Sequence, residues 1–164
     1  MKTIKVIWQG LGGEGIKTAA IILARTINQQ KLFAQSFPEY GPERSGAKTY
    51  AYIRISDHEI LSHYPITKPS IVVSTIKDIK FDCYHILATD FLEKEAQIFY
   101  FPAQKIAKKF KVKYLNLPLL GALIALLEKK YQLDATLTLN SIKKSKKINP
   151  EIIRAGYQEL NSIL

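Results

Sequence analysis

The hydrophobic and polar positions of this chain follow two different periods. In the first hundred residues, short β-branched and apolar runs alternate with turns, which is typical of strands inside a sheet. In the last third, apolar residues recur at the three- and four-residue spacing of helices. We predict strands over residues 3–8, 31–36, 48–55, 71–75, 84–89 and 98–101. We predict helices over residues 16–27, 103–110, 117–131 and 133–144, and a last helix capped by Asn149 with Pro150 in its first turn.

This order of elements predicts the class of fold. Strands that alternate with helices and then give way to helices indicate an α/β fold. We expect an open, mostly parallel Rossmann-like sheet flanked by helices, with a helical C-terminal third. The length of 164 residues and the apolar content of 47% suit a single globular domain over residues 1–164.

No segment predicts a membrane span or a leader. The longest apolar stretch, residues 115–127, is interrupted by Asn116, Pro118 and Gly121 and is too short to cross a bilayer. No charged and then apolar leader precedes the first strand, so we expect a cytoplasmic protein without membrane association.

A glycine-rich turn joins the first strand to the first helix. Gly10, Gly12, Gly13 and Gly15 lie within six residues, and a backbone without Cβ atoms can turn sharply and approach a bulky anion closely. The N-terminus of the following helix carries unpaired N–H groups and a partial positive charge. Lys17 and Thr18 in its first turn add a charge and a hydroxyl. These six residues are therefore candidates for binding a phosphate or pyrophosphate group.

Three interpretations of this turn remain open from the residues alone. The spacing of Gly10, Gly12 and Gly15 fits the dinucleotide fingerprint. That fingerprint expects an acidic residue about twenty positions further on, and the second predicted strand ends without one. A different anionic cofactor is favoured over a nicotinamide or flavin nucleotide, and a purely structural turn is the third interpretation. Glu14 brings a carboxylate to the turn, where we expect it to cap the start of the helix.

The loop after the second strand has the composition of a functional loop. Two prolines and two glycines within residues 37–46 exclude a helix and a regular strand. We expect an ordered loop beside the glycine turn, because ligands of open α/β sheets bind outside the carboxyl ends of the strands. An Arg–Glu pair that ties down a long turn is the alternative. The candidate residues of this loop are Tyr40, Gly41, Pro42, Glu43, Arg44, Ser45 and Gly46.

Charge and cysteine content narrow the function further. The net charge of +10 attracts anionic partners, but the lysines are scattered and no nucleic-acid-binding pattern accompanies them, so we expect a solvated basic surface and no nucleic acid. The single cysteine, Cys83, cannot hold a zinc ion or an iron–sulfur cluster alone, and we expect a half-buried small apolar side chain. His58, His63 and His85 show no metal-ligand spacing, and we expect no metal site.

Four segments, taken in order, resemble one protein family. They are GLGGEGIKTAAIILA at residues 10–24, SFPEYGPERSGAKTYAYIRIS at 36–56, LNLPLLGALIALL at 115–127 and INPEIIRAGY at 148–157. Together they resemble the gamma subunit of the 2-oxoacid:ferredoxin oxidoreductases, over residues 4–157. The related subunit of indolepyruvate:ferredoxin oxidoreductase and a free-standing nucleotide-binding module are the alternatives.

This resemblance implies a role within an assembly. Enzymes of the family oxidatively decarboxylate a 2-oxoacid such as pyruvate or 2-oxoglutarate, reduce ferredoxin through iron–sulfur clusters and release an acyl-coenzyme A. Thiamine diphosphate, Mg²⁺ and the clusters are expected on thiamine-binding alpha and beta subunits and a ferredoxin-like delta subunit. The sequence agrees, because it has one cysteine and no Gly-Asp-Gly segment with a downstream Asn. No catalytic residue is expected on this chain.

The resemblance also assigns a role to the glycine turn. It implies a coenzyme A site at Gly12, Gly13, Gly15, Lys17 and Thr18, with the loop of residues 40–46 as a second wall that touches coenzyme A or a neighbouring subunit. Within that loop Arg44 is the candidate for a phosphate or carboxylate contact, because its fork suits either. This chain departs from the family at Glu14, where the gamma subunit usually has glutamine, and its segment 76–83 is shorter than expected.

Overall fold

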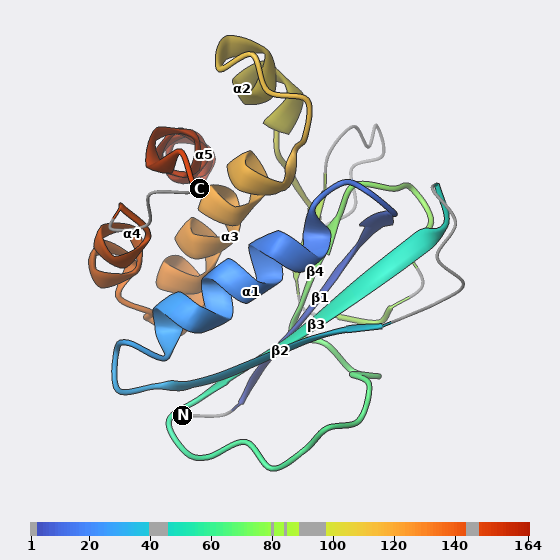
Figure 1. Ribbon diagram of the computed structural model, residues 1–164, viewed down its shortest axis with the longest axis vertical. Coiled ribbons are helices and arrows are strands. Elements are labelled where there is room, and N and C mark those ends of the chain that lie inside the picture. The colour runs from blue at the N-terminus through green and yellow to red at the C-terminus, as the bar shows by residue number, and fades with distance from the viewer. Residues whose placement is uncertain (1–2, 40–45, 80, 84, 89–97, 144–147) are drawn as a thin grey trace.

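The computed structural model describes residues 3–39, 46–79, 81–83, 85–88, 98–143 and 148–164 (Figure 1). Within these residues the strands are β1 Ile4–Leu11, β2 Phe33–Glu39, β3 Lys48–Ser56, β4 Ile71–Ser74, β5 His85–Ala88 and β6 Ile98–Tyr100. The helices are α1 Ile16–Ile27, α2 Ala103–Lys109, α3 Asn116–Tyr131, α4 Ala135–Lys143 and α5 Pro150–Ile163. Each strand and helix predicted from the periodicity is present, and Asn149 caps α5 through the Glu151 N–H as expected. The prediction that residues 37–46 exclude a regular strand was wrong for residues 37–39, which continue β2 and pair with β3. Pro38 is tolerated there because β2 is an edge strand.

The strands form one sheet in the order β2-β3-β1-β4-β5-β6. β1, β4, β5 and β6 pair in parallel, whereas β3 runs antiparallel to both of its neighbours, β1 and β2. The α/β class and the mostly parallel sheet are therefore confirmed. The direction of β3 follows from the short connection after β2, since a parallel crossover needs a dozen or more residues and usually a helix.

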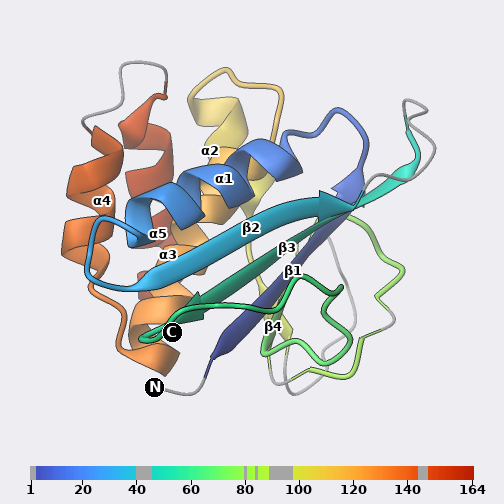
Figure 2. The same cartoon turned by 60° about the horizontal axis from the view of Figure 1, so that its bottom comes forward.

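One face of the sheet carries the main hydrophobic core. In β1 the alternating side chains of Ile4, Val6 and Trp8 are buried on this face, below α1 and α3. Figures 1 and 2 show α1 crossing β1, β2 and β3 on the same side as the other labelled helices. α3 is buried continuously from Pro118 to Leu127, because α1, α4 and α5 surround it.

α3 and α5 meet through a pair of glycines. A Cβ atom on Gly121 would overlap the carbonyl oxygen of Ile153 and lie 2.7 Å from the Tyr157 nitrogen. A Cβ atom on Gly156 would overlap the carbonyl oxygen of Pro118. The two helix backbones are therefore in direct contact, which only glycine at both positions allows.

The opposite face of the sheet has a smaller core. Ile7, Tyr52 and Val72 are buried there beneath Ile66, from the segment between β3 and β4. Phe81 and Cys83, from the segment between β4 and β5, pack against the same cluster. In the described part of the chain this face is thus covered by irregular segments, and none of the described helices is long and apolar enough to cross a bilayer.

Candidate functional site

The glycine turn lies at the carboxyl end of β1, where the sheet order reverses. β1 has β3 on one side and β4 on the other. After β1 the chain enters α1, which packs over β2 and β3, whereas β4 is followed by β5 on the opposite side. In open α/β sheets ligands bind at such a point, outside the carboxyl ends of the two diverging strands. The topology therefore places the predicted site where this fold usually binds ligands.

The four glycines serve different purposes. Gly13 and Gly15 have φ angles of +92° and +76°, in the region that favours glycine. Added Cβ atoms would overlap Glu14 and Thr75 at Gly10, and Asn116 at Gly15. At Gly13 an added Cβ would meet no atom within 4 Å, and this residue is exposed. Side chains thus crowd Gly10 and Gly15, and Gly15 also needs its positive φ, whereas Gly13 borders open space.

Two helix N-termini meet at this turn. Gly15 is the N-cap of α1, and the N–H groups of Ile16, Lys17 and Thr18 precede the first hydrogen bond within that helix, from Ala19 to Gly15. The side chain of Asn116, the first residue of α3, donates to the Gly15 carbonyl at 3.1 Å. Figure 1 shows the starts of α1 and α3 at the same end of the sheet. The partial positive charges of two helix termini therefore lie together at Gly15.

Glu14 has a different role from the one that we expected. Its carboxylate accepts hydrogen bonds from the Leu11 N–H at 2.9 Å and from the Thr75 hydroxyl. It does not cap α1, whose N-cap has no side-chain hydrogen bond, so the prediction of a helix cap was wrong. The reason is that Glu14 precedes the N-cap and its side chain folds back toward the end of β4. Glu14 thus joins the carboxyl ends of the two diverging strands.

Replacement of Glu14 tests this bridge. Both donors reach the same oxygen, Oε2, so a Glu14→Gln variant retains one acceptor for both and should lose less than about 1 kcal/mol of stability. Glu14→Ala leaves the donors without that acceptor at a partly exposed site and should cost about 1–2 kcal/mol. Urea denaturation followed by circular dichroism measures both. Equal losses in the two variants would contradict the bridge.

The buried side chain of Gln9, directly before the glycine turn, links β1 to β4 and to the segment after β4. The Gln9 side chain is 1% exposed, and its Nε2 atom donates to the Ser74 hydroxyl at 2.9 Å and to the Asp78 carbonyl at 3.1 Å. Lys48 forms an ion pair with the Asp78 carboxylate, which raises the pKa of Lys48 through their hydrogen bond. These contacts hold the segment after β4 against the ends of β1 and β3. Sequence reasoning missed them, although a glutamine directly before the glycines was a usable signal.

The C-terminal end of the loop of residues 40–46, which was predicted to form a second wall of the site, lies beside the glycine turn. The Gly12 N–H donates to the Ala47 carbonyl at 2.8 Å, next to Gly46, which has a φ angle of +87°. The expected proximity of the loop and the turn is thus confirmed at this end of the loop. The same bond occupies the Gly12 N–H, and the Leu11 and Glu14 N–H groups donate to the Glu14 carboxylate and the Leu11 carbonyl, so these three amides of the turn are engaged within the chain. Tyr40, Gly41, Pro42, Glu43, Arg44 and Ser45, and with them the Arg–Glu alternative, lie outside the described residues.

The prediction for Cys83 is confirmed. Cys83 is half-buried against the smaller core, and burial raises the pKa of its thiol, so it remains protonated and weakly reactive. His58 and His63 are exposed. Within the described ranges, no three His, Cys, Asp or Glu side chains gather in a way that suits a metal ion.

Known proteins resemble this chain in sequence. The family profile for "Pyruvate ferredoxin/flavodoxin oxidoreductase" matches residues 5–159. The pyruvate synthase subunit PorC of Methanothermobacter marburgensis is 40% identical over 70 residues, which are 43% of this chain and 40% of that protein. The common subunit gamma of the pyruvate/ketoisovalerate oxidoreductases of Thermococcus kodakarensis is 40% identical over 70 residues, 43% of this chain and 38% of that protein. The matched stretch thus spans less than half the length of these curated relatives.

Solved structures share the fold over 99% of this chain. The pyruvate oxidoreductase subunit PORC of Thermotoga maritima aligns with a TM-score of 0.69 at 23% identity, over 95% of its own length. The 2-oxoglutarate:ferredoxin oxidoreductase of Magnetococcus marinus, with 2-oxoglutarate, coenzyme A and succinyl-CoA bound, aligns with a TM-score of 0.67 at 15% identity, over 30% of its length. The profile match over residues 5–159 extends this agreement from fold to family. The chain belongs to the pyruvate ferredoxin/flavodoxin oxidoreductase family.

Proposed function

We propose that this chain is the gamma subunit of a multi-subunit 2-oxoacid:ferredoxin oxidoreductase and forms one side of its coenzyme A site. The observation that carries this proposal is the family match over residues 5–159 together with the glycine turn at the point where β1 and β4 diverge. The reaction converts a 2-oxoacid, coenzyme A and two oxidised ferredoxins into an acyl-coenzyme A, CO₂, two reduced ferredoxins and a proton. This chain supplies binding groups and no redox centre.

Other subunits carry the electron-transfer chemistry in this proposal. Iron–sulfur clusters need several thiolates, and the sequence has one cysteine, which is half-buried. We assign thiamine diphosphate with Mg²⁺ to alpha and beta subunits and the clusters to a ferredoxin-like delta subunit, which passes electrons to ferredoxin. The chain would then act within the complex through the surface around the glycine turn.

The residues at the turn suit a phosphate group of coenzyme A. Gly13 borders open space, and the N-termini of α1 and α3 converge at Gly15, two residues further on, which favours an anion. Lys17 and Thr18 lie in the first turn of α1, and Thr18 is exposed. Glu14 adds a negative charge, but its carboxylate is held by Leu11 and Thr75 rather than directed at the helix N-terminus. The residues present therefore fit a phosphate at Gly13 and the start of α1.

The relative from Magnetococcus marinus supports this assignment at the level of the assembly. That enzyme binds coenzyme A and succinyl-CoA, and one region of it shares the fold of this chain. In the proposed complex the loop of residues 40–46 forms the second wall. Its Arg44 would pair with a phosphate or with a carboxylate of a neighbouring subunit.

Reconstitution of the complex tests the proposed function. The purified partner subunits are mixed with and without this chain, and acyl-coenzyme A formation is measured alongside size-exclusion chromatography. We expect the omission of this chain to abolish either assembly or acyl-coenzyme A formation. Acyl-coenzyme A formation at the full rate without this chain would overturn the proposal. Micromolar binding of ATP or NAD by the isolated chain would instead support a free-standing nucleotide-binding module.

A further inference from the structure

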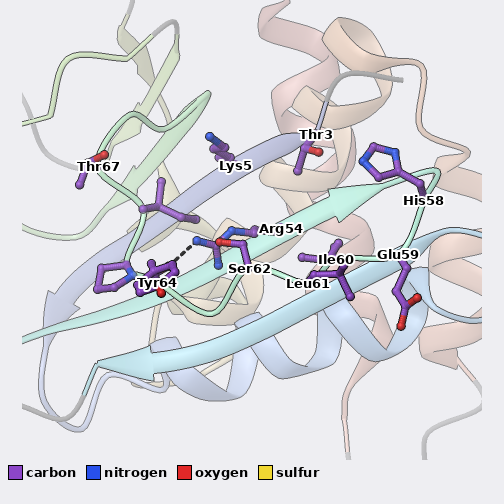
Figure 3. Close-up of a pocket in the computed structure, with 12 residues that line it drawn as sticks. Thr3, Lys5, Arg54, His58, Glu59, Ile60, Leu61, Ser62, Tyr64 and Thr67 are labelled. Carbon is purple, nitrogen blue, oxygen red and sulfur yellow. Dashed lines mark hydrogen bonds between the residues drawn. The ribbon is translucent and has the colours of Figure 1, made fainter.

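A cavity lies on the face of the sheet opposite the helices. Its volume is about 300 Å³, and it is formed by the first residues of β1, the end of β3 and the segment between β3 and β4 (Figure 3). Lys5 and Arg54 both line it. Leu11 follows Lys5 by six positions of extended strand, so the cavity lies about 20 Å from the glycine turn, toward the opposite end of β1. The coenzyme A site proposed above does not involve it.

Two positive side chains face each other across the strands of this cavity. Lys5 on β1 is the direct pairing partner of Arg54 on β3. Paired residues of antiparallel strands point to the same face with Cβ atoms about 5 Å apart, where like charges destabilise the sheet. Gln35 on β2 pairs with Arg54 from the other side and extends the row with a neutral amide. The strands thus hold two like charges in register without an acidic residue between them.

The Arg54 guanidinium is buried without a carboxylate. The residue is 4% exposed, and its Nη atoms donate to two neutral acceptors, the Tyr64 carbonyl and Gln35 Oε1, the latter at 3.4 Å. Its guanidinium carbon lies 5.2 Å from the centre of the Phe37 ring. Burial lowers the pKa of Arg54, which reflects the cost of a charge removed from water. Buried charges in proteins are ordinarily paired, and this one lacks an acidic partner among the described residues.

The acidic residue at the rim does not supply the missing charge. Glu59 lines the cavity, but Figure 3 shows its carboxylate directed away from Arg54. His58, also at the rim, contacts Asp57 at 2.9 Å, so the Asp57 carboxylate is engaged outside the row of Lys5 and Arg54. Anchoring of the segment between β3 and β4 accounts for the Arg54 bond to Tyr64. It does not explain why Lys5 places a second positive charge next to Arg54, because the Lys5 amine takes no part in that contact.

We propose that this cavity binds a small oxyanion, the phosphate or carboxylate group of a ligand, between Lys5 and Arg54. The planar guanidinium of Arg54 carries five N–H donors, and its hydrogen bonds to Gln35 and Tyr64 use only some of them. A fork of this kind suits either a phosphate or a carboxylate group. The hydroxyl of Ser62 also lines the cavity and adds a neutral donor. A bound oxyanion separates the two like charges and pairs both of them.

Titration of the ¹⁵N-labelled full-length chain by NMR tests the proposal. Inorganic phosphate and acetate are added separately at constant ionic strength, with chloride as the balancing ion. We expect saturable shifts of the amides of Lys5, Arg54 and Ser62 with at least one of the two anions. Phosphate saturation assigns a phosphate ligand and acetate saturation a carboxylate ligand. Shifts confined to Gly12 through Thr18 would report the glycine turn instead and would overturn this second site.

Matched lysine variants separate a site from general charge. Lys5→Met removes one counter-charge at an exposed position and should weaken anion binding at the cavity about tenfold or more. Lys129→Met removes the same charge from the exposed end of α3, on the other face, and should leave the affinity within about twofold. Arg54→Lys should also weaken binding, because it keeps the charge and loses the fork. Equal effects of Lys5→Met and Lys129→Met, or no saturable shift in the wild type, would overturn the proposal.

Discussion

Replacement of Gly156 by alanine is expected to lower the free energy of unfolding by about 2–3 kcal/mol. The added methyl would overlap the Pro118 carbonyl oxygen and lie 2.9 Å from its carbonyl carbon, so it meets backbone rather than a side chain that can rotate. α5 would have to move away from α3, whose buried residues contact α1 and α4. Alanine favours a helix over glycine by about 1 kcal/mol, which makes a net loss of stability diagnostic of the clash.

Urea denaturation followed by circular dichroism measures this loss. Gln158→Ala is the matched control, because Gln158 is exposed on the same helix and its truncation should change stability by less than about 0.5 kcal/mol. Gly121→Ala should be destabilising for the reciprocal reason. The double variant should lose less than the sum of the two, since helices separated by one methyl already make room for the other. A Gly156→Ala variant as stable as the wild type would show that α3 and α5 do not touch in this way.

The second large effect is expected at Gly13 in the assembled complex. Gly13→Asp places a carboxylate in the open space that precedes the start of α1, whereas Gly13→Asn adds a side chain of the same shape without charge. Both residues tolerate a positive φ better than other side chains do. At about 6 Å from a phosphate, the added charge costs about 1–3 kcal/mol, so the Asp variant should raise the KM for coenzyme A about tenfold or more above that of the Asn variant.

Steady-state kinetics with the two substrates varied in turn measures this difference. The KM for the 2-oxoacid should be the same in both variants, because the thiamine-bearing subunits bind that substrate in the proposed assembly. High salt should reduce the gap between the Asp and Asn variants, as it screens an exposed charge. Equal KM values for coenzyme A in the two variants would remove the glycine turn from the coenzyme A site and leave the family assignment intact.

The predicted elements agree with the structure because they depend on local patterns. The apolar runs and the helical spacing identify each strand and helix, and the cap at Asn149 follows from the adjacent proline. The glycine turn could be placed for the same reason, since a strand, a turn and a helix follow one another within thirty residues. The proximity of Gly46 to this turn followed from a general rule about the carboxyl ends of strands.

The features that sequence reasoning missed depend on pairing between distant residues. The bond of Glu14 to Thr75 requires that β4 lie beside β1, which no local pattern states. The opposition of Lys5 and Arg54 requires the register of β1 against β3, and a shift of one residue would have separated them. Asn116 belongs to one of the four segments that resemble the family. Its contact with Gly15, however, joins residues 101 positions apart in the sequence, which no local pattern indicates.

The glycine contact between α3 and α5 links the C-terminal helix to the glycine turn at the carboxyl end of β1. At Gly121 and Gly156 backbone meets backbone, so no rotating side chain absorbs a displacement of α5. A displacement of α5 would therefore press directly on the backbone of α3, and Asn116, at the start of α3, is hydrogen-bonded to the Gly15 carbonyl. The helical third of the chain is therefore tied to the backbone of the glycine turn by an unbroken series of contacts.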